Sequence, residues 1–203
     1  PCSPPPDSWA SPLPSFFLSN PLPAAPDHWN RPVPAEGPAD APIVIVGLAP
    51  GLRGANRTGR PFVGDASGAW VYTAMAAHGL LRDGVPAGVR VTNAVKCVPP
   101  KNLPTPAERA TCRERWLAAE LAASPAGVFV ALGAVAHAEI AAVAGARLAF
   151  AHGAEDVVPL GGRPRHVLAS YHPSPQNTHT RRLTAAMFDA VIARASGLVE
   201  GRG

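Results

Sequence analysis

The sequence predicts an α/β fold: a three-layer α/β/α sandwich around a central, mostly parallel four-stranded sheet. Short apolar runs rich in β-branched residues alternate with helix-forming segments along the chain, and such alternation is typical of a parallel sheet covered on both faces. The chain has 203 residues, 47% of them apolar, which is enough for one sizeable core. No apolar stretch runs unbroken for roughly 18 residues, so no membrane-spanning helix is expected.

Four apolar runs are expected to form the strands. They are 43–47, which ends at a glycine, then 89–95, 127–133 and 166–170. Helices are expected over 66–81, 106–123, 134–143 and 181–196. The first of these helices has Asp65 or Ser67 as its N-cap. The second begins with Thr105 as N-cap, followed by proline and by Glu108 at the third position, which forms a capping box.

Residues 1–40 differ from the rest of the chain because prolines recur throughout them. Proline removes a backbone donor and fixes φ, which disfavours long helices and central strands. We expect an irregular N-terminal arm that packs on a body at residues 41–198 through its aromatic residues, which are Trp9, Phe16, Phe17 and Trp29. A partly disordered tail is the alternative.

The charge of the chain bears on its partner, and its cysteine count bears on its redox environment. The net charge is +4, and every basic residue except Lys96 and Lys101 is arginine. This permits a nucleic-acid partner, and the arginine bias fits either bidentate phosphate contacts or the base composition of a genome. Three cysteines are an odd number, which fits reduced thiols or metal ligands in a cytosolic protein better than a secreted disulfide scaffold.

Three polar segments follow predicted strands at one edge of the sheet. They comprise 47–51 with its continuation 56–68, then 92–100, and finally 171–178. Ligands of open α/β sheets bind outside the carboxyl ends of the strands. We therefore expect these segments to converge on one site.

Four side chains in these segments have both a chemical and a structural interpretation. Phe62 can stack on a base or lie in the core, and Asp65 can stabilise charge or cap a helix. Asn93 can offer a donor and an acceptor to an amide-like edge or serve as a turn residue. His172 can donate to a developing anion or be structural. Their convergence on one edge favours the chemical interpretation.

The motifs in these segments resemble those of the uracil-DNA glycosylases, specifically the family 5 (UDGb) branch. The matching stretches are GLAPG at 47–51, GANRTGRPFVGDASG at 54–68, TNAVKCVPPKNLPTPAER at 92–109 and SYHPSPQNTHTRRLT at 170–184. The resemblance continues through HWNRPVP at 28–34 and VALGAVA at 130–136, so that it covers roughly residues 28–196. The apolar Leu48 also matches family 5, whereas the related family 4 enzymes carry a glutamate there.

The resemblance implies that the protein flips a damaged base out of DNA into a pocket. Phe62 would stack on the uracil, Asn93 would read its Watson–Crick edge, and His172 would bond to O2 as the glycosidic bond breaks. Asp65 would orient water or stabilise the oxocarbenium-like sugar, which makes Asp65, Asn93 and His172 the catalytic set. The backbone around 49–52 would help to hold the base. The first motif supplies Gly47, Leu48, Ala49, Pro50 and Gly51 to the substrate site.

The resemblance also implies DNA contacts and a cluster. The loop at 175–178 would enter the gap left by the flipped base. The residues assigned to DNA binding are Ser67, Ser170, Ser174, Gln176, Asn177 and Arg181. Enzymes of families 4 and 5 carry a structural [4Fe–4S] cluster on four cysteines, and Cys97 and Cys112 match two of them. Cys2 would be a third, with the fourth before Pro1. A decayed cluster site, another ligand, and three ordinary buried thiols are the alternatives.

The implied activity is that of a monofunctional DNA repair glycosylase. It would hydrolyse the N-glycosidic bond of uracil in single- or double-stranded DNA and leave an abasic site, acting as a monomer in the cytoplasm at the nucleoid. The apolar Leu48 suggests a roomier site that also takes hypoxanthine or other deaminated bases. The alternatives are a non-catalytic lesion-binding iron–sulfur module and an α/β protein that acts on free nucleosides.

Overall fold

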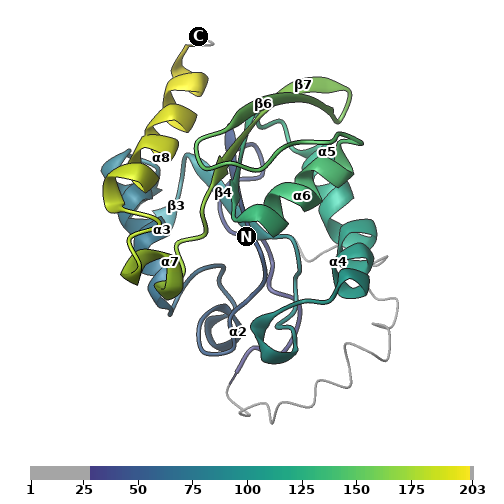
Figure 1. The fold of residues 1–203 in the computed structure, drawn as a ribbon, viewed down its shortest axis with the longest axis vertical. Coiled ribbons are helices and arrows are strands. Elements are labelled where there is room, and N and C mark those ends of the chain that lie inside the picture. Colours follow the sequence, from purple (N-terminus) through teal and green to yellow (C-terminus); the bar gives the residue numbers. More distant parts are fainter. Residues whose placement is uncertain (1–27, 202–203) are drawn as a thin grey trace.

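A five-stranded sheet forms the centre of the molecule. The computed structural model describes residues 28–201, and the sheet has the strand order β4-β1-β5-β7-β6 (Figure 1). Four strands run parallel, and β6 pairs antiparallel with β7 at the edge. The strands are β1 Ile43–Gly47, β4 Val89–Asn93, β5 Val128–Leu132, β6 Glu155–Leu160 and β7 Arg163–Ser170. The register pairs Gly47 with Asn93, so these two residues end neighbouring strands at the same edge.

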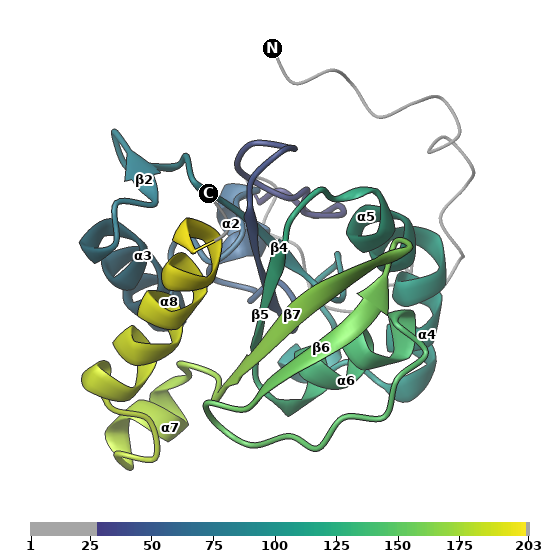
Figure 2. The same cartoon turned by 90° about the horizontal axis from the view of Figure 1, so that it is seen from above.

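Helices cover both faces of this sheet (Figure 2). Alternate residues of β1 show the two layers: Ile43 and Ile45 belong to the core formed with α3 and α8, whereas Val44 and Val46 belong to the core formed with the helices of the opposite face. The helices are α2 Ala55–Thr58, α3 Ala66–Ala77, α4 Pro106–Cys112, α5 Ala118–Ala123, α6 Ala134–Val143, α7 Pro175–His179 and α8 Ala185–Glu200. The sandwich predicted from the sequence is therefore confirmed.

The predicted number of strands was wrong. The fifth strand, β6, carries Glu155, Asp156 and Pro159, which obscure its apolar pattern. Such residues are tolerated because β6 lies at the sheet edge, where one row of backbone donors has no strand to pair with.

Helix boundaries also differ from the predicted ones. The helix expected over 66–81 ends at Ala77, and a small hairpin of β2 Leu81–Arg82 and β3 Val85–Pro86 follows it. The helix expected over 181–196 is α8, whose start is shifted because Thr184 caps it by accepting from the Met187 amide. A short 3₁₀ turn, η2 Pro100–Asn102, and a π-helical segment, η3 Arg113–Leu117, complete the elements.

The described part of the arm, residues 28–40, contacts three regions of the body. The Trp29 amide donates to the Asn56 carbonyl (2.7 Å), and the Val33 amide donates to the Lys96 carbonyl (2.7 Å). Glu36 forms an antiparallel bridge with Val91 of the edge strand β4. The predicted anchors Trp9, Phe16 and Phe17, and also Cys2, lie outside the described residues. Within residues 28–201, no helix is both long and apolar enough to cross a membrane.

Candidate active site

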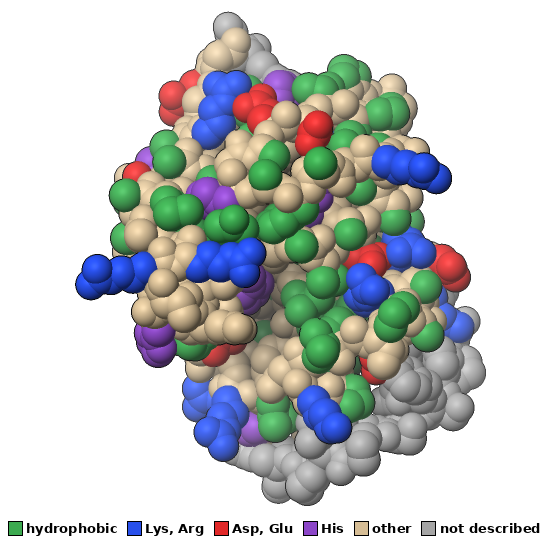
Figure 3. All heavy atoms as spheres, in the orientation of Figure 1, with side chains coloured by type: hydrophobic (Ala, Val, Ile, Leu, Met, Phe, Trp, Pro, Cys, Tyr) green, Lys and Arg blue, Asp and Glu red, His purple; other side chains and the backbone are tan. Residues whose placement is uncertain are grey.

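A pocket of about 160 Å³ lies at the carboxyl edge of the sheet. A cavity of about 150 Å³ is known to accept a benzene ring, so this pocket has the scale of one six-membered base. The lining comes from all three converging segments and comprises Leu48, Ala49, Pro50, Gly51, Ala55, Phe62, Asp65, Ser67, Asn93, Asn102 and His172. In the space-filling view, Lys and Arg side chains are spread around this hollowed face (Figure 3).

Phe62 is buried in the pocket wall with its backbone in the left-handed region, at φ 60°. Two glycines give it room, because a Cβ at Gly47 would lie 2.3 Å from the Phe62 ring and one at Gly68 would lie 1.5 Å from the Phe62 carbonyl oxygen. The ring centroid lies 6.5 Å from that of His172, with the planes at 32°. The ring therefore lines the pocket and also belongs to the core. The two interpretations from the sequence, stacking on a base and packing in the core, are compatible.

Asp65 is both the N-cap of α3 and a pocket residue. Its Oδ1 accepts from the Gly68 amide at 2.8 Å. Its Oδ2 faces the glycine loop, where a Cβ at Gly51 would lie 3.3 Å away and one at Gly54 only 2.4 Å away. One carboxylate oxygen is thus engaged by the helix while the group still lines the pocket, so the capping role and a chemical role are compatible.

Asn93 ends β4 and is 4% exposed. Its Oδ1 would meet a Cβ at Gly47 at 2.5 Å, so a glycine is required beside it. The backbone after Asn93 is tied to the first motif, since the Ala94 and Val95 amides donate to the Gly47 and Leu48 carbonyls at 2.9 Å each. This pairing brings the first two motifs together.

His172 follows β7, and side chains hold the backbone on both sides of it. Asn177 Nδ2 donates to the His172 carbonyl at 2.8 Å, while the Tyr171 amide donates to His152 Nδ1 at 3.1 Å. The rings of His152 and Tyr171 stack at 5.1 Å. Burial lowers the pKa of His172, and the negative charge of Asp65 offsets this only in part. The imidazole is therefore neutral at pH 7, a state in which one ring nitrogen donates and the other accepts.

The structure places the residues assigned to DNA binding in different surroundings. Gln176 and Arg181 are exposed on and after α7, whereas Ser67 lines the pocket. Ser174 is the N-cap residue of α7, with no side-chain capping bond. Ser170 is completely buried at the end of β7, and its hydroxyl donates to the Tyr171 carbonyl at 2.9 Å. Its contact with DNA stays a prediction.

Two pocket residues were missed by the sequence analysis, Ala55 and Asn102. Asn102 Oδ1 accepts from the Leu52 amide at 3.2 Å, so that this backbone donor, expected to help hold the base, is already engaged. Lys101 and Asn102 both have positive φ values, 55° and 56°. Asparagine tolerates that region better than most residues, and an asparagine in a proline-rich loop was the signal available in the sequence.

Cys97 and Cys112 lie near one another beside the pocket loops. Burial and the neighbouring Cys112 raise the pKa of Cys97 to about 12, and burial likewise raises the pKa of Cys112. Cys112 packs with Val95 and Trp116, and Ala49 of the first motif lies against this cluster. Across residues 28–201 no three Cys, His, Asp or Glu side chains form a metal-binding group. The described residues therefore supply two of the four thiolates that a [4Fe–4S] cluster requires.

The fold and pocket define a class: an α/β protein with a base-sized site at the carboxyl edge of a parallel sheet. The family model of the uracil DNA glycosylase superfamily matches residues 34–196. The chain belongs to this superfamily.

Individual relatives indicate which branch of the superfamily the chain resembles. The chain is 47% identical to the type-5 uracil-DNA glycosylase of Thermus thermophilus, covering 84% of this chain and 82% of that protein. It is 44% identical to the type-5 enzyme of Pyrobaculum aerophilum, covering 83% and 77%. Among solved structures, that of Pedobacter heparinus SMUG2 matches with a TM-score of 0.53 at 14% identity over 78% of this chain and 76% of that one, which shows the shared fold.

Proposed function

We propose that this protein is a type-5 uracil-DNA glycosylase that hydrolyses the N-glycosidic bond of uracil in DNA and leaves an abasic site. The observation that supports it most is the convergence of Phe62, Asp65, Asn93 and His172 on one base-sized pocket. The type-5 enzymes that the chain resembles along most of its length carry this activity in their names.

Each side chain has a role that fits its geometry. Phe62 stacks on the extruded base, and the Asn93 amide matches the donor and acceptor pattern of the uracil edge. The neutral His172 donates to O2 as negative charge develops on the leaving base. The Asp65 carboxylate stabilises the cationic sugar or orients water, while its Oδ1 keeps the helix cap. A base leaves readily only when its anion is stabilised, so His172 and Asp65 act on the two charges of the same transition state.

The proposed contacts with DNA involve exposed side chains outside the pocket. Arg181 and Gln176 are exposed on and after α7, the helix that follows His172 in the chain, and would contact phosphates. The loop at 175–178 would fill the gap left by the flipped base. We include single- and double-stranded DNA as substrates, and hypoxanthine as a second base admitted beside the apolar Leu48. The catalytic domain would be residues 41–198, acting as a monomer in the cytoplasm at the nucleoid.

A [4Fe–4S] cluster on Cys97, Cys112, Cys2 and a fourth cysteine is part of the same proposal. It is supported by the neighbouring buried thiols of Cys97 and Cys112. When bound, the cluster would serve structure, by joining the two ends of the loop that carries Asn102. Iron and acid-labile sulfide in anaerobically purified protein test it, and a folded, active sample without iron would contradict it.

The activity is tested with end-labelled duplexes that carry uracil, hypoxanthine or thymine opposite guanine, followed by alkali to cleave abasic sites. Cleavage at uracil, with or without cleavage at hypoxanthine, is the expected result. Binding of the uracil duplex without cleavage would instead indicate a lesion-binding module. Cleavage of free deoxyuridine but not of DNA would indicate a nucleoside hydrolase.

A further inference from the structure

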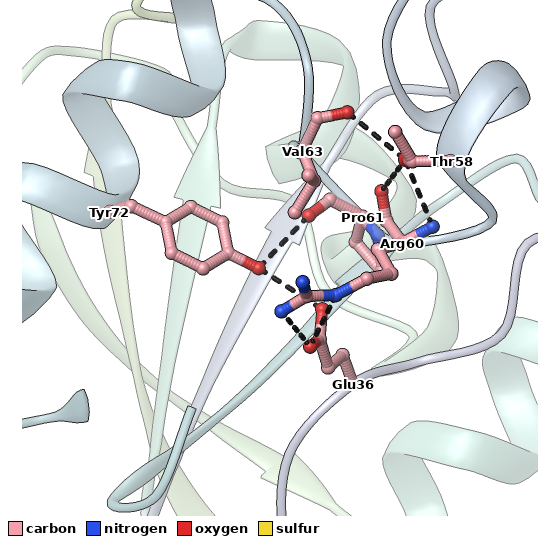
Figure 4. Close-up of polar contacts among 6 residues, drawn as sticks. All are labelled: Glu36, Thr58, Arg60, Pro61, Val63 and Tyr72. Carbon is pink, nitrogen blue, oxygen red and sulfur yellow. Dashed lines mark hydrogen bonds and ion pairs between the residues drawn. The ribbon is translucent and has the colours of Figure 1, made fainter. Parts of the chain in front are cut away.

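The backbone on both sides of Phe62 is held by hydroxyl groups from neighbouring elements (Figure 4). Thr58 Oγ1 lies 3.1 Å from the Val63 carbonyl oxygen and 3.3 Å from those of Gly54 and Arg60, so it shares one proton among them. The Tyr72 hydroxyl lies 3.3 Å from the Pro61 carbonyl. A non-glycine residue at positive φ costs free energy and persists only where its surroundings fix it. The contacts at Pro61 and Val63 fix the peptide groups that flank the strained residue.

Tyr72 is itself held by a carboxylate from the N-terminal arm. Its hydroxyl lies 3.1 Å from Glu36 Oε2, so a single proton is shared between Glu36 and the Pro61 carbonyl. Burial is the main cause of a raised pKa at Tyr72, so the hydroxyl keeps that proton at neutral pH.

Glu36 is firmly placed in turn. Its Oε1 accepts from Arg60 Nε at 2.9 Å and from Arg60 Nη2 at 2.6 Å. Its backbone exchanges two hydrogen bonds with Val91 of β4, at 2.9 and 2.8 Å. Its side chain is 17% exposed. Both Arg60 donors meet one oxygen of the carboxylate in charge-assisted hydrogen bonds, and this pair connects the edge of the sheet to the segment just before Phe62.

We propose that Tyr72 is a positioning residue for base excision, anchored by Glu36, and that it acts by holding the strained Phe62 backbone so that the ring faces the flipped base. This rests on the proposed function, since Phe62 matters only if a base enters the pocket. Neither Tyr72 nor Glu36 lines the pocket. Their direct contact with the site is through the 60–63 segment, by the Tyr72 hydroxyl at Pro61 and the Glu36 carboxylate at Arg60.

The test is a double-mutant cycle between Tyr72→Phe and Phe62→Leu. Tyr72→Phe keeps the ring and removes the hydroxyl, while Phe62→Leu removes the stacking surface and keeps an apolar side chain. Excision of uracil is followed under single turnover, and inhibition by free uracil is measured alongside. Ser196→Ala, which removes a hydroxyl from α8 that has no hydrogen-bond partner among residues 28–201, is the matched control.

Tyr72→Phe is expected to slow excision and to weaken inhibition by uracil, each by about tenfold, the equivalent of one hydrogen bond. In the Phe62→Leu background the same change should cost less than about twofold. Equal losses in both backgrounds, or a slower reaction with unchanged uracil inhibition, would overturn the proposal. If the wild-type protein excises no uracil, the proposed function fails instead. If the wild type is active and Tyr72→Phe excises uracil at the same rate, only this inference fails.

Discussion

The two walls of the pocket are built in different ways. The backbone that carries His172 is held by two direct side-chain contacts: Asn177 donates to the His172 carbonyl, and the Tyr171 amide donates to His152. The wall that carries Phe62 depends on a strained backbone to which two glycines give room. Its flanking peptide groups contact Thr58 and Tyr72, and Tyr72 is bonded in turn to Glu36 of the arm. The first wall is therefore held directly, whereas the second is held through a series of contacts, so substitutions far from the base should reach it.

The largest effect is expected at the wall that carries His172. His172→Leu removes the imidazole donor that faces the developing anion and puts no donor in its place, and loss of one such donor costs about 100-fold in rate. Single-turnover excision measures it, and a loss below about threefold would remove His172 from the reaction.

The same variant should alter the dependence of stability on pH. Because burial lowers the pKa of His172 below its usual 6.5, the unfolded chain binds the proton more readily than the folded one. Folding stability is therefore full above pH 6.5 and declines as the pH falls through this value toward the lowered pKa. The pKa values of His137 and His152 are lowered as well, and both residues remain in the variant, so the two proteins share that part of the loss. The wild type also loses the His172 contribution, so it should lose more thermal stability than His172→Leu between pH 7.5 and 5.5. Identical losses would contradict the assignment.

A distant substitution tests the other wall. Gly68→Ala in the first turn of α3 would place a Cβ 1.5 Å from the Phe62 carbonyl oxygen, so the backbone must shift. We expect about tenfold slower excision and a lower melting temperature. Gly197→Ala on α8 is the control, because nothing lies within 4 Å of its added Cβ and alanine stabilises a helix relative to glycine. If both variants melt alike, the tight contact at Gly68 is not a constraint.

The smallest effect concerns DNA binding beyond both walls. Arg181→Gln should weaken binding of a uracil duplex modestly and lower the slope of log affinity against log salt by about one. Arg163 lies at the start of β7, at the opposite edge of the sheet from the pocket. Arg163→Gln should therefore leave the slope unchanged. A slope altered equally by both variants would place the DNA elsewhere.

The sequence predicted the parts of this molecule that repeat a physical pattern. Apolar runs marked β1, β4, β5 and β7, and the capping box at Thr105 marked the start of α4. The edge strand β6 was not predicted, because its charged residues and proline obscure the apolar pattern and are tolerated at a sheet edge. In the pocket, Phe62 and Asp65 stand in polar, glycine-rich sequence and could be identified.

The supporting network could not be predicted in this way. Glu36, Arg60 and Tyr72 are far apart in the chain and have no periodicity in common. Their meeting depends on how the arm crosses β4, and Asn102 likewise reaches the pocket through a loop conformation that residue patterns do not encode.

Under the proposed function the Asp65 carboxylate takes part in the reaction and does more than cap α3. Asp65→Asn separates the two roles, because asparagine is an equally good N-cap but carries no charge to stabilise the cationic sugar. The most direct measurement is the single-turnover rate of uracil release by Asp65→Asn beside the wild type, with melting temperatures for both. We predict a rate at least about tenfold lower with an unchanged melting temperature. An unchanged rate would contradict the claim and leave Asp65 as a cap alone.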